Sequence, residues 1–137
     1  MFDEDLQYGE CGEKFVMEAL SNYFHESIKK NPVHSSKECD LIGNTITFEV
    51  KRDRMAPTTG NVALEIAYKG EPSGILGTKA DYWVTVINKE IWIGSVPILK
   101  EWIFEEDAPA VYGGDNMNSR IVLMNKETFK NMFCKIN

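Results

Sequence analysis

The sequence predicts a mixed α/β fold in which one mixed β-sheet is flanked by helices. Apolar residues recur at helical spacing near the start of the chain, and short segments that alternate apolar with polar residues follow. The 137 residues are 43% hydrophobic and 26% charged, which is typical of a globular protein rather than of a disordered chain, collagen or a coiled coil. We therefore expect a single domain over residues 1–137, with its core at about 9–96 and a helix–strand–helix extension at 97–137.

The first predicted element is a helix over residues 10–28. Its apolar residues recur every three or four positions and make one continuous face. They are Phe15, Val16, Ala19, Leu20, Tyr23 and Phe24. Glu13 lies at the shoulder of this face, about 70° from its centre when each residue turns the helix by about 100°. We therefore single out Glu13 as an acid at the edge of a buried surface.

A β-hairpin is predicted next, because residues 39–42 and 45–52 flank Gly43-Asn44, a two-residue turn signal. The second strand alternates, so that its apolar residues share one face and Glu49 and Lys51 share the other. Glu49 and Lys51 therefore lie on the face opposite the apolar one, where polar side chains are available for binding or catalysis.

The register of this hairpin places two carboxylates on one face. If Ile42 pairs with Thr45, Asp40 lies on the same face as Glu49 and Lys51. Asp40 and Glu49 are then diagonal neighbours with Cα atoms about 7–8 Å apart, and their carboxylates can converge on one ion at about 2.0–2.6 Å per bond. Carboxylate ligands favour Mg²⁺ or Mn²⁺, whereas zinc would prefer His or Cys.

The remaining strands, helices and loops are expected in the following order along the chain. A third strand is predicted at residues 61–68, with a helix as the alternative because of its alanines, and a Gly-rich loop with a helical turn at 69–79. After these come two strands at 82–87 and 91–96, a helix from Pro97 to about 105, a mobile loop at 106–118, a strand at 120–124 and a terminal helix capped by Asn125.

Charge is distributed unevenly along the chain. Fifteen basic and 21 acidic residues give a net charge of −6. Residues 1–28 carry one base and seven acids, residues 29–79 carry eight bases and six acids, and residues 80–137 carry six bases and eight acids. Only the middle segment, at +2, favours a polyanion, so nucleic-acid binding must be local or assisted by metal ions.

The cysteines and the absence of long apolar runs indicate the cellular compartment in which the protein is expected. Cys11, Cys39 and Cys134 are odd in number and widely spaced, which suits a reducing cytoplasm better than a disulfide framework. No run approaches the ~20 apolar residues that a membrane-spanning helix needs, and the acidic first ten residues are not typical of a signal peptide. We therefore expect no membrane partner.

The acidic pattern resembles the signature of the PD-(D/E)XK nuclease superfamily, which is an acid, a short gap and then acid-x-lysine at a strand end. Here it stands as Asp40 in ECDLIGN and as Glu49-Val50-Lys51 in ITFEVKRD. Glu13 in GEKFV matches the helix-one glutamate of the branch that is similar to archaeal Holliday-junction resolvases and small phage endonucleases. The resemblance spans about residues 9–87 and implies a restriction-endonuclease-like αβββ…β core.

The resemblance implies a metal-dependent endonuclease that hydrolyses phosphodiester bonds of DNA, with branched DNA as the expected substrate. It implies that Asp40, Glu49 and the Val50 carbonyl bind Mg²⁺ or Mn²⁺, that Lys51 helps to activate water, and that Glu13 supports the metal or its water. Symmetric cleavage of a junction needs two active sites, so a homodimer follows from that substrate.

This chain departs from the family pattern in three places. Cys39 stands where the family usually has proline, only eight residues separate Asp40 from Glu49, and the usual core helix is reduced to residues 72–79. Glu38 is an alternative to Asp40, because the same register places it opposite Glu49. The shortened helix bears on the substrate groove more than on the metal site.

Further residues have weaker claims on the site. Arg52, Arg54 and Lys79 are candidates for contacts with nucleic-acid phosphates, or are ordinary charges of a strand end and a turn. Glu65 is a candidate outer carboxylate on a looser match.

Two alternative functions stay open. A nuclease-like fold that binds DNA or a protein without cutting would explain the net negative charge and the reduced helix. A Mg²⁺-dependent phosphoesterase acting on nucleotides would use the same carboxylates. Metal binding distinguishes the first alternative from a nuclease, and turnover of small phosphodiesters alone distinguishes the second.

Overall fold

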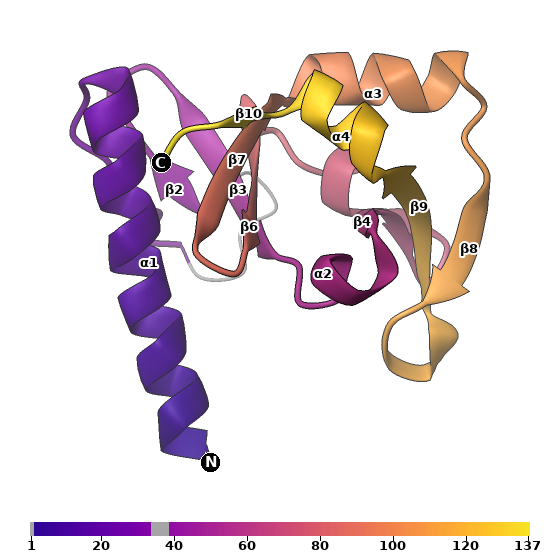
Figure 1. Ribbon diagram of the computed structural model, residues 1–137, viewed down its shortest axis with the longest axis horizontal. Helices are drawn as coiled ribbons and strands as arrows, with labels where there is room; N and C mark the ends of the chain where they lie inside the picture. Colours follow the sequence, from indigo (N-terminus) through magenta and orange to yellow (C-terminus); the bar gives the residue numbers. More distant parts are fainter. Residues whose placement is uncertain (1, 34–38) are drawn as a thin grey trace.

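The computed structural model describes residues 2–33 and 39–137 (Figure 1). Within these residues the fold is mixed α/β, as predicted, but it contains two β-sheets where the sequence predicts one. The helices are α1 (Phe2–Phe24), α2 (Ala56–Thr59), α3 (Val96–Glu105) and α4 (Lys126–Met132), with short 3₁₀ turns η1 (Gly74–Leu76) and η2 (Asp115–Met117). None of the described helices is long and apolar enough to cross a membrane.

The first sheet has six strands and is mixed. In spatial order they are β1 (Lys29–Lys30), β2 (Leu41–Ile42), β3 (Thr47–Arg52), β6 (Tyr82–Ile87), β7 (Glu90–Ser95) and β10 (Cys134–Lys135). Strands β3 and β6 are parallel, whereas the other neighbours are antiparallel. The predicted hairpins β2–β3 and β6–β7 are both present, and the second turns at Asn88, whose φ of 56° suits a tight two-residue turn.

The second sheet has four antiparallel strands. In spatial order they are β5 (Glu71–Pro72), β4 (Asn61–Tyr68), β9 (Ser119–Asn125) and β8 (Ala110–Gly113). Strand β4 has its predicted bounds but pairs with β9, and the mobile loop predicted at 106–118 contains β8 and η2. The C-terminal segment is therefore part of both sheets, because β9 completes the second and β10 extends the first.

Asp53 marks the point where the chain passes from the first sheet to the second. Its backbone N–H donates to the Val86 carbonyl in the first sheet. Its carboxylate accepts hydrogen bonds from the N–H groups of Met55 and Ala56 at the start of α2, and from Ala63 in β4. The carboxylate thus accepts from three donors at the start of α2 and in β4, and the residue redirects the chain away from β3.

Helix α1 covers one face of the first sheet (Figure 1). It begins well before the predicted start and ends at Phe24, before His25 with φ of 56°. Val16 and Leu20 are buried against Phe48 and its neighbours, whereas the predicted face member Phe15 is 42% exposed. The buried stripe is therefore centred on Val16 and Leu20, slightly rotated from the predicted one.

The opposite face of the first sheet carries Glu49 and Lys51, and we call it the Glu49 face. Most of it is covered by the second sheet together with α3 and α4, which Figure 1 shows on the side away from α1. Trp83 of β6 is 1% exposed at the centre of this second core. The predicted Asn125 cap is confirmed, since its side chain accepts from the Thr128 N–H, whereas α3 begins at Val96, one residue before the predicted start, and is capped by Ser95, which accepts from the Ile98 N–H.

Candidate functional site

The β2–β3 hairpin places Asp40 near Glu49, but in a register that differs from the predicted one. Leu41 pairs with Phe48 and Ile42 with Thr47, a shift of two residues from the predicted register. Asp40 precedes β2 and bonds through its N–H to the Phe48 carbonyl, and its charge acts on the neighbouring Glu49. A two-residue shift leaves every side chain on its predicted face, so the shared face survives although the register was wrong.

The turn of this hairpin has four residues because Glu26, two residues after the end of α1, holds it. The Glu26 carboxylate accepts a hydrogen bond from the Thr45 N–H at 3.0 Å and another from the Thr45 hydroxyl. The Gly43 N–H donates to the Ile46 carbonyl at 2.7 Å and closes the turn. The Thr45 bonds lower the pKa of Glu26, since they favour its charged form.

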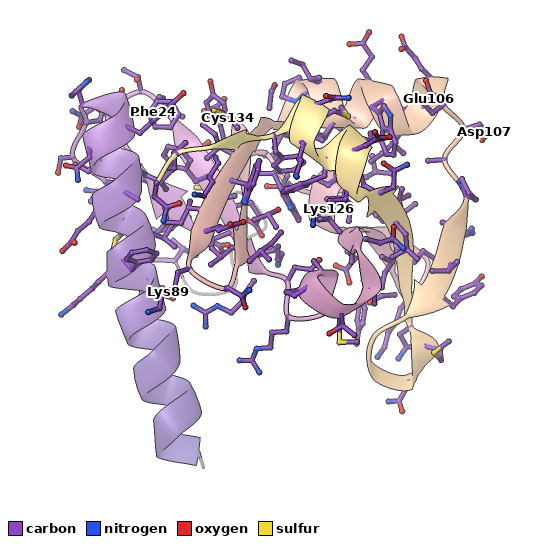
Figure 2. All side chains as sticks on the ribbon, in the orientation of Figure 1. Phe24, Lys89, Glu106, Asp107, Lys126 and Cys134 are labelled. Carbon is purple, nitrogen blue, oxygen red and sulfur yellow. The ribbon has the colours of Figure 1, made fainter. Side chains whose placement is uncertain are left out.

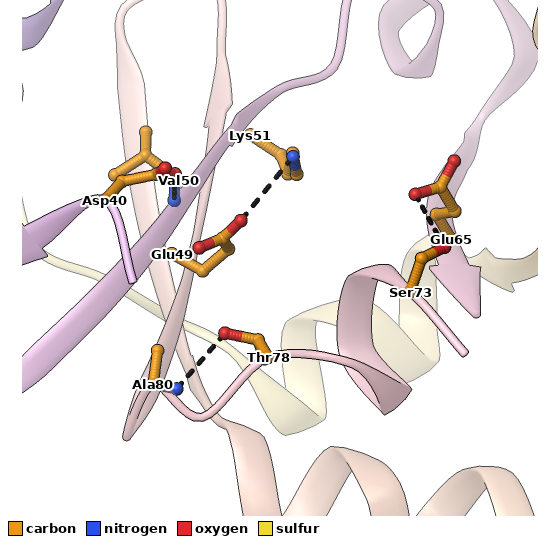
Figure 3. Close-up of polar contacts among 8 residues, drawn as sticks. All are labelled: Asp40, Glu49, Val50, Lys51, Glu65, Ser73, Thr78 and Ala80. Carbon is orange, nitrogen blue, oxygen red and sulfur yellow. Dashed lines mark hydrogen bonds and ion pairs between the residues drawn. The ribbon is translucent and has the colours of Figure 1, made fainter. Parts of the chain in front are cut away.

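Asp40 is held by its backbone and by its carboxylate. Its N–H donates to the Phe48 carbonyl at 2.8 Å, and its carbonyl accepts from the Asn31 N–H at 2.9 Å. Its Oδ2 accepts from the Val50 N–H at 2.9 Å, in the place that a backbone carbonyl of β2 would otherwise take (Figure 3). Asp40 is exposed, so its carboxylate is both oriented and accessible.

Glu49 has an unusual environment for a carboxylate. Its side chain is only 13% exposed, and its Oε1 lies 3.7 Å from Lys51 Nζ. Its Oε2 is buried and has no hydrogen-bond partner among the described residues. Burial and, second, the negative charge of Asp40 raise the pKa of Glu49 to about 7, although Lys51 acts in the opposite direction.

Lys51 lies beside Glu49 on the exposed margin of the same face (Figure 3). Its Nζ is 5.9 Å from the centroid of the Trp83 ring, which orients the ammonium by a cation–π contact. About half of the side chain, 49%, remains exposed. An oriented cation next to a carboxylate pair is therefore accessible to an anionic substrate.

Glu13 does not join this pair. Its Oε2 forms an ion pair with Lys30 Nζ at 2.7 Å, on the face of the first sheet that α1 covers. Over the part of the chain that the structure describes, no group of three or more His, Cys, Asp or Glu side chains is arranged to hold a metal ion. The site is thus a carboxylate pair with a lysine, and Glu38, the alternative to Asp40, lies outside the described residues.

The three candidate phosphate contacts are dispersed. Arg52 is half-buried at the end of β3, with its side chain on the α1 side of the sheet. Arg54 is exposed after the C-terminal end of β3, whereas Lys79 is exposed before the N-terminal end of β6. Because β3 and β6 are parallel, Arg54 and Lys79 lie at opposite ends of this strand pair.

Glu65 belongs to the second sheet, where its carboxylate holds neighbouring segments together. Its two carboxylate oxygens accept hydrogen bonds from Ser73 Oγ at 3.0 Å and Ser119 Oγ at 2.7 Å. Gly74 packs so tightly here that a Cβ atom would lie 2.1 Å from the Glu65 carbonyl oxygen. Glu65 therefore ties β5 and β9 to the bulge in β4 rather than extending the Asp40–Glu49 pair.

Comparison with known proteins adds no assignment. The sequence matches no protein-family model, and it matches no curated protein. The likeness to the PD-(D/E)XK nucleases therefore remains a prediction from the signature residues.

Proposed function

We propose that the protein is a metal-dependent endonuclease that hydrolyses phosphodiester bonds of DNA, in the manner of the PD-(D/E)XK nucleases. The observation that carries the proposal is Oε2 of Glu49, which is buried without a hydrogen-bond partner among the described residues, near Asp40 and beside Lys51. Branched DNA is the substrate that the sequence resemblance favours, and a homodimer would supply two sites for it.

The donor set fits a hard divalent cation. Two carboxylates that lie near each other repel unless a cation lies between them, and the raised pKa of Glu49 expresses that repulsion together with burial. The Val50 carbonyl leaves β3 on the same side as the Val50 N–H, which donates to Asp40, because both groups of one residue point the same way in a strand. Asp40, Glu49 and the Val50 carbonyl would therefore hold Mg²⁺ or Mn²⁺ with oxygen ligands alone.

Lys51 and Asp40 would have separate roles in the cleavage reaction. When bound, the ion supplies polarisation of the phosphoryl oxygen and a water of lowered pKa. Lys51 is held over Trp83 and is half exposed, so its ammonium can orient the attacking water and stabilise negative charge on the phosphate. The hydrogen bond from the Val50 N–H holds the Asp40 carboxylate in one orientation, so this carboxylate is already oriented before substrate binds.

The proposal is tested by a cleavage assay with Mg²⁺ or Mn²⁺. The substrates are a four-way junction, a linear duplex, a single strand and a supercoiled plasmid. We expect Lys51→Ala and Glu49→Gln to reduce cleavage by about 10²-fold or more, the size of effect that loss of one group stabilising a transition state commonly has.

Matched controls are available on the second sheet. Lys69→Ala and Glu71→Gln each remove one exposed charge away from the Glu49 face, and both should cleave at the wild-type rate. Wild-type cleavage by Lys51→Ala would refute the role of Lys51. Metal-independent cleavage by Glu49→Gln would refute the whole assignment.

A nuclease-like fold that binds without cutting is the second candidate. The observation that favours it is the Glu13–Lys30 ion pair, which holds the third acid of the family pattern on the other face of the sheet. In that case the folded protein would bind DNA with the same affinity with and without Mg²⁺, and no substrate in the panel would be cut.

A further inference from the structure

A cavity of about 480 Å³ lies where α2, the β6–β7 hairpin and α4 meet. Its floor is apolar and includes Val62, Ile87, Trp92 and Phe129. The ring centroids of Trp92 and Phe129 are 5.1 Å apart, and Trp92 is only partly buried. The cavity thus offers an aromatic surface in a space of the size that binds small ligands.

The rim of this cavity is basic. Lys126 and Lys130 line it from α4, four residues apart and therefore on one side of the helix, and both are exposed. Figure 2 shows Lys126 at the start of α4, on the side toward α2. Neither lysine forms an ion pair with any residue that the structure describes. Glu90, the acid of the lining, accepts from Trp92 Nε1 at 3.1 Å.

The cavity opens on the Glu49 face of the first sheet. Lys51 pairs with Thr85 across β3 and β6, and Thr85 pairs with Trp92 across β6 and β7. Residues that face each other across neighbouring strands share a face, so Lys51 and Trp92 point to the same side. Their backbones are two strand spacings apart, about 10 Å.

We propose that this cavity binds one unpaired nucleotide, with the base on the apolar floor and the phosphate between Lys126 and Lys130. A flat ring suits the aromatic floor, whereas two exposed ammonium groups on one side of α4 favour an anion at the rim. A nucleotide combines the two chemistries. The overall charge of −6 opposes general coating of nucleic acid, so binding depends on such a local site.

Binding of a nucleotide in the cavity does not depend on the proposed endonuclease function. A role of the cavity in cleavage does rest on that proposed function. If Lys51 acts on the scissile phosphate, the nucleotide in the cavity belongs to the same substrate, because the backbones of Lys51 and Trp92 are only two strand spacings apart, about 10 Å. The substrate would then carry a single-stranded segment next to the cut, as a branched or flapped DNA does. A blunt duplex has no unpaired nucleotide to offer.

Fluorescence anisotropy of a labelled oligothymidine, measured in EDTA with the full chain, tests the binding. We expect the double variant Lys126→Gln/Lys130→Gln to lose about tenfold or more in affinity, because two phosphate contacts are removed. The matched double variant Lys14→Gln/Lys69→Gln removes two exposed charges, one on α1 and one after β4, and should bind as wild type. Equal affinities for the two double variants would overturn the proposal, as would tighter binding of a blunt duplex than of the single strand by the wild type.

Two further measurements are needed. One distinguishes a free nucleotide from a nucleotide within a strand, and the other distinguishes the cavity proposal from the catalytic proposal. AMP, titrated by tryptophan fluorescence, distinguishes a free nucleotide from one within a strand, and its affinity should fall in the same cavity variant. If Glu49→Gln cleaves DNA normally while the cavity variant fails to bind, the catalytic proposal fails and the cavity stands. Circular dichroism verifies that each variant is folded.

Discussion

Glu49 is the residue whose surroundings are hardest to explain by stability alone. A carboxylate that is mostly buried, lies near Asp40 and leaves Oε2 without a hydrogen-bond partner among the described residues costs free energy in the folded state. The ion pair with Lys51 at 3.7 Å offsets only part of that cost. Such a residue destabilises the fold that contains it, and functional sites are where this kind of penalty is commonly retained.

This penalty makes the stability of the metal-free protein depend on pH. The pKa of Glu49 is raised from 4.5 to about 7 in the fold, so the folded state holds the proton more tightly than the unfolded chain. The stability that comes from the protonated form is complete below pH 4.5 and is lost as the pH rises through 7. Glu49→Gln keeps a neutral side chain at every pH and should escape this loss.

We therefore expect Glu49→Gln to be more stable than wild type at pH 8 in EDTA. The full pKa shift corresponds to about 3 kcal/mol, and access of solvent to the site reduces the expected gain to about 1–2 kcal/mol. Urea unfolding at pH 5 and pH 8 measures it. A difference between the two proteins that is the same at both pH values would show that Glu49 does not titrate in this range.

At the scale of elements, local signals gave the positions of strands and caps, and distant contacts set the register. Ser95 and Asn125 cap α3 and α4 through bonds within three residues, which sequence patterns describe well. The turn before β3 was predicted with two residues, because nothing near Gly43 reveals that Glu26, which follows α1, will hold Thr45. Two-residue strands such as β10 carry too little pattern to be predicted at all.

The Glu26–Thr45 contact should therefore contribute to the stability of the hairpin that presents Asp40. The pKa of Glu26 is lowered in the fold, so its contribution is present at neutral pH and is lost as the pH falls through the folded-state pKa. Glu26→Gln should lower the melting temperature at pH 7, and the difference from wild type should shrink at pH 3. Glu18→Gln, an exposed change on α1, is the control. Equal melting temperatures for Glu26→Gln and wild type at pH 7 would show that the contact contributes nothing.

Two glycines of positive φ provide a matched test of close packing at the β4 bulge. Gly74 has φ of 55° and would place a Cβ atom 2.1 Å from the Glu65 carbonyl oxygen, whereas Gly60 has φ of 76° and open space around it. Gly60→Ala should cost about 1–2 kcal/mol from backbone strain alone. Gly74→Ala adds a clash with backbone and should cost at least about 3 kcal/mol. Similar unfolding free energies for the two variants in urea would contradict the close approach.

At the scale of the whole molecule, the first sheet separates two surfaces. Helix α1 with Glu13 covers one face, and the carboxylate pair and the basic-rimmed cavity share the other (Figure 1). The α/β class and most elements follow from periodicity, but the division into two sheets does not. It depends on pairings such as β4 with β9, which join segments far apart in the chain and leave no local trace.

The same reasoning explains how much of the site could be predicted. Alternation placed Asp40, Glu49 and Lys51 on one face, because side-chain parity survives a register shift of two residues. The shoulder position of Glu13 on α1 was read correctly as partly exposed, but its partner Lys30 depends on which face of the sheet α1 covers. The cavity at Trp92 combines α2, β7 and α4, and only the folded chain brings them together.

The measurement that tests the central claim most directly is a calorimetric titration with Mn²⁺ at pH 6 and pH 8. A metal ion at Asp40 and Glu49 must displace the proton of Glu49, so we expect affinity to rise about tenfold between these pH values. Glu49→Gln should abolish binding, and Glu71→Gln should leave it unchanged. Wild-type affinity that is flat with pH, or that survives in Glu49→Gln, would contradict a metal site at this carboxylate pair.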